Sequence, residues 1–210
     1  KLMPYYGSHD TSAKIRNQIA WSSDIKAVVW TEIVTEKIKK QMELLNKINQ
    51  NREAALLQSY IDDIQYGDSS NREGHAAKVY FNALFGKDFT RTSDCNINAA
   101  LNYGYSIILS SFTREIVANG YITQIGLFHD NMFNQFNLAS DMMEPFRPIV
   151  DELVFNMELH VFEKSEKMEL VNLLNKQVYI NNRTEYMSNA IKIYCKSIFD
   201  ALGDKDIAMI

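Results

Sequence analysis

The most apolar run of the chain is residues 95–119, CNINAALNYGYSIILSSFTREIVAN. Its apolar residues recur with the period of an α-helix, and both faces of that helix are largely apolar. A helix without a polar face has to be covered on all sides, so we expect it to lie at the centre of the fold. Gly120 follows the run and predicts where this helix ends.

Further helices are predicted on both sides of this central one. They cover residues 11–22, 24–48, 52–66, 71–85, 140–162, 165–175 and 184–202. In the second of them, apolar residues follow steps of three to five, which predicts an amphipathic helix with Lys37, Lys39 and Lys40 on its solvent side. Residues 121–136 are rich in Gly, Phe, Asn and His and are expected to be irregular.

The composition favours an all-α fold. With 210 residues, 46% of them hydrophobic and 23% charged, the chain can bury the core of one domain. Eight glycines and three prolines are too few for a sandwich or barrel with many tight turns. We therefore predict a compact helical domain over residues 12–202, an extended linker at 1–11 and a tail at 203–210.

Charge and cysteine usage limit the expected partners and location. The net charge of −4 gives the whole chain no electrostatic preference for nucleic acid, so an anionic partner requires a local basic patch. No apolar run approaches the about 20 residues of a membrane span, and no signal peptide is recognisable. Cys95 and Cys195 lack CxxC spacing, as expected for reduced thiols. We predict a cytoplasmic protein without a membrane partner.

Two segments carry residues that are unusual in a plain helical bundle. Ser70 and Glu73 have the spacing of a capping box, and Gly74 beside them would let another backbone or a ligand approach. His129 lies in the irregular segment, where a histidine serves more often as a structural hydrogen-bonding group than as a ligand. Neither position alone establishes a functional site.

A third segment pairs two carboxylates with two prolines. Asp141 and Glu144 are three residues apart, so both side chains lie on one face near a helix start, where they also fit an N-cap pair. Pro145 and Pro148 each lack an amide donor and predict a kink. Such a bend could direct side chains into a cavity.

Together these residues could form a metal site. If Glu73, His129 and Glu144 meet in the folded chain, two carboxylates and one imidazole make an open site suited to Mg²⁺ or Mn²⁺ more than to structural zinc. Such an ion can activate a hydroxyl nucleophile and neutralise charge on a phosphate. Arg147, about one turn after Glu144, could hold an adjacent phosphate oxygen. From the residues alone, the metal site and the helix caps both stay open.

Four motifs occur in order over roughly residues 70–155. The first is NREGHAAK at 71–78 with Tyr80-Phe81, and the second is Asn98 with ALNYGY at 100–105. The third is GLFH at 126–129, and the fourth covers residues 138–151 with DMMEPFRP at 141–148. Together they resemble the C-terminal helical catalytic domain of the CRISPR-associated adaptation integrases, metal-dependent enzymes that insert new spacers into the CRISPR array. Residues 2–8 and 18–21 are similar to the type II branch of that family.

The resemblance implies roles for particular residues. It implies that Glu73, His129 and Glu144 are the catalytic metal ligands and that they hold Mg²⁺ or Mn²⁺. Asp141 matches an acidic position that supports the site. Arg147 matches a basic position that faces DNA.

Other polar residues of these motifs are expected to be structural. Asn102 and Tyr105 belong to a helix motif and are expected to pack and to support the site from behind. His75 is expected to be structural rather than catalytic. His9 and His160 match no functional position.

The resemblance also implies an activity and partners. The expected enzyme is an endonuclease and integrase that joins 3′-hydroxyl ends of spacer DNA to the CRISPR repeat by transesterification. Its expected partners are spacer-precursor DNA, repeat DNA, a second copy in a homodimer, a small second adaptation protein and other type II CRISPR proteins. The resemblance leads us to expect that the given residues lack the family's N-terminal β-domain and that residues 1–11 match the linker that would follow it.

Two other functions stay open at this point. One is a non-catalytic helical interaction module in which Glu73, Asp141 and Glu144 are helix caps. The other is a stand-alone metal-dependent nuclease that cuts branched DNA without joining ends.

Overall fold

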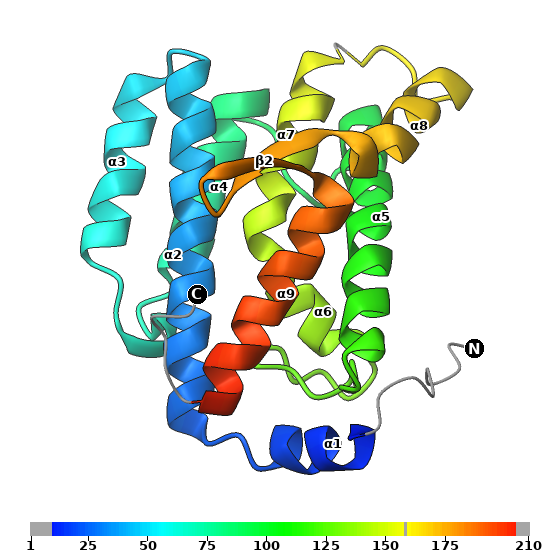
Figure 1. The fold of residues 1–210 in the computed structure, drawn as a ribbon. Helices are drawn as coiled ribbons and strands as arrows, with labels where there is room; N and C mark the ends of the chain where they lie inside the picture. The colour runs from blue at the N-terminus through cyan, green and yellow to red at the C-terminus, as the bar shows by residue number, and fades with distance from the viewer. Residues whose placement is uncertain (1–9, 158, 205–210) are drawn as a thin grey trace. The chain divides into compact units, whose positions relative to one another are not determined.

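The computed structural model describes residues 10–157 and 159–204, and most of them are helical (Figure 1). The α-helices are α1 (Thr11–Ile19), α2 (Ser23–Lys47), α3 (Asn51–Asp62), α4 (Arg72–Phe85), α5 (Asn96–Ala118), α6 (Asn137–Met142), α7 (Arg147–Asn156), α8 (Lys164–Val171) and α9 (Met187–Asp204). The short 3₁₀ helices are η1 (Tyr66–Asp68), η2 (Glu144–Phe146) and η3 (Asn172–Asn175). Strands β1 (Gln177–Ile180) and β2 (Arg183–Tyr186) form an antiparallel hairpin. The predicted helical fold class is confirmed, with the hairpin as an addition.

Backbone contacts divide the chain into two compact units. The first comprises residues 1–30, 108–143 and 174–210, and the second comprises residues 31–107 and 144–173. Each unit is therefore built from stretches that are far apart in the sequence. Residues of α2 and of α5 belong to both. Most of the predicted linker and tail lies outside the described residues, so these boundaries stay predictions.

The first unit buries apolar side chains from each of its stretches, among them Val29, Phe112 and Ile198. The ring of Phe112 contacts that of Tyr194 edge to face, with 6.2 Å between the centroids. Cys195 is buried in the same unit, and this burial raises the pKa of its thiol. A protonated buried thiol behaves as a small apolar side chain, so Cys195 is part of the core.

A buried amide fixes the irregular segment of the first unit. Gln18 is 1% exposed, and its Oε1 accepts a hydrogen bond from the backbone N–H of Ile122 at 2.9 Å. Its Nε2 donates to the carbonyls of Ile122 and Ile125 at 2.8 and 3.1 Å. Further along, Nδ2 of Asn137 donates to the carbonyl of Gln124 at 3.0 Å. The segment is irregular as predicted, and side-chain hydrogen bonds hold its backbone in place.

In the second unit, α5 and α7 approach each other closely. A Cβ on Gly104 would collide with the side chain of Val150 and would lie 3.2 Å from Cδ2 of Leu170. Only glycine permits this separation, because any other residue would push the two helices apart. One side of α5 is buried, and its fully buried apolar residues are Ala100, Leu101, Ile108, Phe112 and Ile116. The prediction that this helix is covered on all sides is wrong, because small and polar residues at 99, 102, 106, 110, 114 and 118 form an exposed stripe along it.

The helix predicted over residues 140–162 is wrong in its extent. It is divided into α6, η2 and α7, and α7 already ends at Asn156. The reason is the pair of prolines. Pro145 lies in η2, and Pro148 occupies the first turn of α7. A proline is tolerated there because the N–H groups of the first turn make no hydrogen bond within the helix. The predicted kink is therefore a complete break.

The helix predicted to begin at residue 184 starts three residues later, because residues 183–186 form β2. Asn181 and Asn182 connect the two strands with positive φ angles of 50° and 60°. Asparagine tolerates this conformation, which two-residue hairpin turns require. The alternation of exposed and half-exposed residues in β1 has the period of a strand.

Among residues 10–157 and 159–204, no helix combines the length and apolarity that crossing a bilayer requires.

Candidate active site

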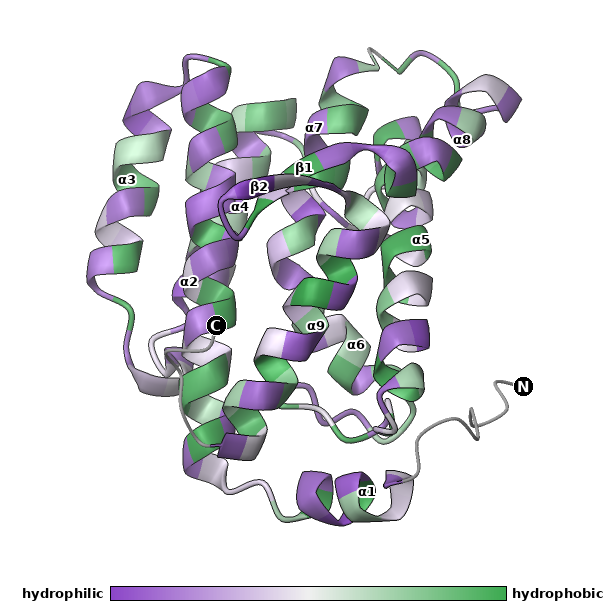
Figure 2. Cartoon of the chain, viewed as in Figure 1, coloured by the Kyte–Doolittle hydropathy of each residue, from purple (hydrophilic) through white to green (hydrophobic). Residues whose placement is uncertain are grey.

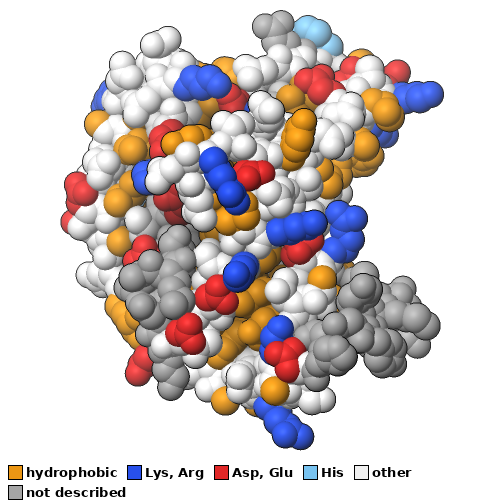
Figure 3. All heavy atoms as spheres, viewed as in Figure 1, with side chains coloured by type: hydrophobic (Ala, Val, Ile, Leu, Met, Phe, Trp, Pro, Cys, Tyr) orange, Lys and Arg blue, Asp and Glu red, His pale blue; other side chains and the backbone are white. Residues whose placement is uncertain are grey.

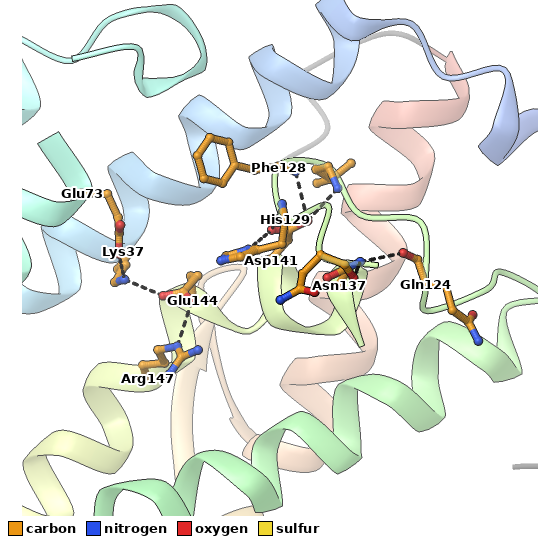
Figure 4. A network of polar contacts seen from close by, with 11 residues as sticks. Lys37, Glu73, Gln124, Phe128, His129, Asn137, Asp141, Glu144 and Arg147 are labelled. Atoms are coloured by element: carbon orange, nitrogen blue, oxygen red, sulfur yellow. Dashed lines mark hydrogen bonds and ion pairs between the residues drawn. The ribbon is translucent and has the colours of Figure 1, made fainter. Parts of the chain in front are cut away.

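A buried lysine occupies the centre of the site in the second unit. Nζ of Lys37 forms an ion pair with Oε1 of Glu73 and lies 2.5 Å from Oε2 of Glu144 (Figure 4). Lys37 is only 6% exposed, so the prediction that it lies on the solvent side of its helix is wrong. Hydrophobic and hydrophilic residues alternate along α2 (Figure 2), and Lys37 is three and four residues from the buried Val34 and Gln41. Those spacings place it on the buried stripe.

The two carboxylates keep this lysine charged. Burial alone would lower the pKa of Lys37, but the charges of Glu144 and Glu73 raise it, and the net change is upward. The ammonium is therefore protonated at neutral pH. In the structure, these two carboxylates together bind the ammonium group of Lys37.

Glu144 also binds an arginine. Nε of Arg147 donates to Oε1 of Glu144 at 2.9 Å, and the Glu144 side chain is 6% exposed. Burial lowers the pKa of Arg147, the charge of Glu144 raises it, and the result is a raised pKa. The interpretation of Glu144 as a helix cap is wrong, because its carboxylate pairs with the side chains of Lys37 and Arg147.

Glu73 is not part of a capping box. The carboxylate of Asp68 caps α4 instead, accepting from the backbone N–H groups of Arg72 at 2.7 Å and Glu73 at 3.0 Å. The side chain of Glu73 is thereby directed to Lys37. A Cβ on Gly74 would lie 2.8 Å from Oδ1 of Asn71, so this glycine accommodates a side chain of the same turn.

The paired groups line a pocket of about 240 Å³ in the second unit. Its lining residues are Lys37, Gln41, Glu73, Ala77, Phe81, Arg91, Tyr105, Glu144, Arg147 and Asp151. The pocket contains three basic and three acidic side chains, so it provides both donors for a phosphate and carboxylate oxygens for a cation. On the molecular face drawn in Figure 3, basic and acidic side chains are likewise interspersed.

A buried carboxylate, that of Asp151, also lines the pocket. Asp151, 1% exposed, accepts hydrogen bonds from the hydroxyls of Tyr80, at 3.0 Å, and Tyr105. Burial raises the pKa of Asp151 to about 6, although the hydrogen bonds from Tyr105 and Tyr80 oppose the increase. The prediction that Tyr105 packs and supports the site agrees with this contact. Asp151 ends the last of the four motifs, but no role was predicted for it.

His129 lies in the first unit and is held by Asp141. Nδ1 of His129 is 2.5 Å from Oδ1 of Asp141, which is completely buried. With Asp141 as the acceptor, the neutral imidazole carries its hydrogen on Nδ1 and its lone pair on Nε2, the arrangement of a metal-ligating histidine. The ring of Trp30 packs edge-on against the imidazole, with 5.9 Å between centroids.

Asp141 is likewise no helix cap. Its Oδ2 accepts from the backbone N–H groups of Leu127 at 2.6 Å and Phe128 at 3.1 Å, and Oδ1 accepts from that of His129 at 3.1 Å. A Cβ on Gly126 would lie 2.7 Å from Oδ2 and would collide with the carbonyl of His129. The backbone of the Gly126–His129 motif therefore wraps around one carboxylate. This arrangement leaves no room for a side chain at residue 126.

Three other positions singled out in the sequence have structural contacts. Oδ1 of Asn102 accepts from Nη2 of Arg91 at 2.7 Å. The ring centroids of His75 and Tyr60 are 6.2 Å apart. The backbone carbonyl of His160 accepts a hydrogen bond from Nδ2 of Asn96. His9 lies outside the described residues.

The family model described as CRISPR associated protein Cas1 matches residues 2–169. This chain belongs to the Cas1 family. The resemblance predicted from the four motifs is thereby confirmed.

Curated Cas1 proteins match over most of the chain. The CRISPR-associated endonuclease Cas1 of Neisseria meningitidis is 33% identical over 213 residues, covering 97% of this chain and 69% of the relative. The CRISPR-associated endonuclease Cas1 1 of Francisella tularensis subsp. novicida is 24% identical, covering 80% of this chain and 59% of the relative. This chain therefore spans about three fifths to seven tenths of the length of these Cas1 proteins.

Solved structures share the fold at low sequence identity. A Cas1 protein from Thermotoga maritima has a TM-score of 0.71 at 19% identity, covering 94% of this chain and 70% of its own. A casposase bound to its integration product has a TM-score of 0.76 at 19% identity, covering 95% of this chain and 71% of its own. A chain of a partial Cas6-RT-Cas1–Cas2 complex has a TM-score of 0.79 at 16% identity, covering 99% of this chain and 75% of its own.

The proposed ligands of this Cas1 chain have partners within their own units. Glu73 and Glu144 already hold one positive group, the ammonium of Lys37, and the Asp141 contact prepares the imidazole of His129 for ligation. Within the described residues, no group of three or more His, Cys, Asp or Glu side chains is arranged to hold a metal ion. The three-ligand site stays a prediction.

Proposed function

We propose that this Cas1 chain is a divalent-metal-dependent endonuclease and integrase of CRISPR adaptation. The observation that carries the proposal is the convergence of Glu73 and Glu144 on one cationic group, next to Arg147, in a member of the Cas1 family. The printed names of the curated relatives, which are endonucleases, and of the casposase with its integration product support the same class of reaction.

The ligands proposed for Mg²⁺ or Mn²⁺ are Glu73 and Glu144 in the second unit and His129 in the first. When bound, such an ion supplies Lewis acidity at the target phosphate and stabilises the charge that develops there. Asp141 holds the imidazole with its Nε2 lone pair available for ligation. Arg147 uses Nε for Glu144, which leaves its terminal N–H groups as donors to a phosphate oxygen.

The proposed reaction is a transesterification. The 3′-oxygen of the spacer DNA forms a bond to phosphorus while one P–O bond of the repeat strand breaks. The proton of the attacking hydroxyl is released, and the departing 3′-oxygen takes up a proton. One phosphodiester replaces another, so no external energy source is needed.

The proposed partners follow from the family. They are spacer-precursor and repeat DNA, a second copy of the chain in a homodimer, a small second adaptation protein and other type II CRISPR proteins. One solved structure with the same fold is a chain of a Cas1–Cas2 complex, which supports the second adaptation protein as a partner. The type II branch and a cytoplasmic location stay predictions.

A strand-transfer assay with Mn²⁺ tests the assignment. We expect Glu73→Ala, His129→Ala and Glu144→Ala each to lower joining of DNA ends by about 100-fold or more, because each change removes a proposed ligand. Glu43→Ala is the matched control, since Glu43 is exposed on α2 and pairs only with Lys40 in the described contacts. Wild-type joining by all three variants would contradict the site.

The same assay separates the alternatives. A stand-alone nuclease would cut branched DNA in every reaction without producing joined ends. A non-catalytic interaction module would neither cut nor join DNA. Its premise that Glu73, Asp141 and Glu144 cap helices disagrees with their side-chain contacts.

A further inference from the structure

Arg91 lines the same pocket as Glu73 and Glu144, although the loop that contains it has no role in the proposed function so far. This loop joins α4 to α5. An arginine side chain that is held against a pocket has less conformational entropy than one that extends into solvent. Specific contacts must offset this loss.

Two asparagines of α5 orient the guanidinium. Nη1 of Arg91 donates to Oδ1 of Asn98, and Nη2 donates to Oδ1 of Asn102 at 2.7 Å. Asn98 is 3% exposed, and its Nδ2 donates to the carbonyls of Thr90 and Ser93, both at 2.8 Å. One buried side chain therefore fixes the loop on both sides of Arg91 and the arginine itself.

Two aromatic rings complete the support. Cζ of Arg91 lies 5.6 Å from the ring centroid of Phe81 and 5.3 Å from that of Tyr105. Cζ of Arg147 lies 4.6 Å from the same Tyr105 ring, whose hydroxyl is bound to Asp151. The fixed ring thus contacts both guanidinium groups that line the pocket.

The partners of Arg91 leave its charge uncompensated. Within the part of the chain that the structure describes, no Asp or Glu forms an ion pair with Arg91, whereas Lys37 and Arg147 both pair with carboxylates. The two asparagines use two of the five N–H groups of a guanidinium. Such a planar, charged fork matches two oxygens of a phosphate.

We propose that Arg91 binds a backbone phosphate of the DNA that occupies this pocket, with Asn98 and Asn102 as its positioning residues. This inference rests on the proposed function, because it takes DNA as the substrate. It adds a phosphate contact that neither the four motifs nor the assigned site residues include.

The salt dependence of DNA binding tests the contact. Binding of a short duplex to the chain is measured over a range of NaCl concentrations for wild type, Arg91→Gln and Arg52→Gln. We expect Arg91→Gln to reduce the slope of log affinity against log salt by about 1, the value of one lost phosphate contact. Arg52→Gln removes the same charge from an exposed position on α3 and should keep the wild-type slope.

Further variants distinguish position from charge. Arg91→Lys keeps a positive charge but not the fork, so we expect nearly the wild-type salt slope and slower strand transfer at saturating DNA. Asn102→Leu should give the same pattern, because it removes an orienting acceptor and leaves Arg91 in place. If Arg91→Gln does not fold, as judged by its melting curve, the lysine variant decides: strand transfer at the wild-type rate would overturn the proposal.

Two outcomes separate this inference from the proposed function. Wild-type slopes for Arg91→Gln would overturn the phosphate contact alone, provided that the wild-type chain binds and joins DNA. A wild-type chain that neither binds nor joins DNA would overturn both. Binding of Mn²⁺, followed by calorimetry, should be unchanged in Arg91→Gln and weakened in Glu73→Gln, which checks that the metal site is intact.

Discussion

Lys37 is buried between two carboxylates, although the side chains of Lys39 and Lys40 on the same helix are 52% and 38% exposed. Charge alone therefore did not reveal which lysine belongs to a site. The spacing of Lys37 from Val34 and Gln41 places it on the buried side of α2. A buried lysine is predicted with reason only when the carboxylates that pair with it are known. Those partners, Glu73 and Glu144, lie far away in the sequence.

Replacing Lys37 should destabilise the metal-free chain. Lys37→Met leaves two carboxylates without their ammonium, and we expect a loss of about 3 kcal/mol in the free energy of unfolding, as for other broken buried pairs. Added Mn²⁺ should recover more stability in this variant than in wild type, because the ion no longer competes with the ammonium. Urea unfolding with and without Mn²⁺ measures both effects. Lys40→Met is the control, and equal losses for both variants would contradict the role of Lys37.

Asp151 should make the stability depend on pH. Its pKa is raised to about 6 in the folded chain, above its ordinary value of 3.8, so folding favours the protonated form. The resulting stabilisation is present below pH 4 and is lost as the pH rises through about 6. A difference of about two pKa units corresponds to about 3 kcal/mol. Urea unfolding of wild type and Asp151→Asn at pH 4, 5 and 7.5 should show wild type losing stability relative to the variant as the pH rises. A constant difference would exclude the raised pKa.

At the scale of elements, the helices were predictable and their interruptions were harder to locate. The long apolar run of α5 and the period of α2 are strong local patterns, and Gly86 ends α4 with a φ of 99°, as a C-terminal glycine should. Strands β1 and β2 have four residues each, too few for a pattern of period two to stand out. The Asn181-Asn182 pair was the remaining indication of a hairpin.

The contact between α5 and α7 gives an element-scale prediction. Gly104→Ala should destabilise the second unit by about 1–3 kcal/mol, because the added methyl group collides with Val150. The double variant Gly104→Ala/Val150→Ala should recover part of this loss. Gly203→Ala in α9 is the control, since nothing lies within 4 Å of its added Cβ. Thermal unfolding of the four proteins measures the coupling, and a neutral Gly104→Ala would contradict the close approach.

At the scale of the whole molecule, the sequence motifs identified the family but not the contacts among their residues. Asp141 and His129 are twelve residues apart and their contact joins two adjacent motifs. Glu73 and Glu144, in contrast, are connected through Lys37, which belongs to none of the four motifs. Sequence order cannot show such a bridge, because it depends on which helix faces converge in the folded chain.

Binding of a divalent ion should stabilise the whole chain. At a Mn²⁺ concentration 100 times the dissociation constant, linkage gives about 2.7 kcal/mol, which for a chain of this size raises the melting temperature by about 5–10 °C. EDTA should reverse the increase, and Glu73→Ala and Glu144→Ala should abolish it. Glu43→Ala should keep it. A melting temperature that does not respond to Mn²⁺ in wild type would argue against the proposed ligands.

The amide of Gln18 has a consequence for synthesis on the ribosome. Its partners Ile122 and Ile125 are translated more than a hundred residues later, so the Gln18 amide is hydrogen-bonded to water until they emerge. Ile198, in the core of the same unit, follows later still. We therefore expect the segment that presents His129 to acquire its final conformation only after these later residues have been translated.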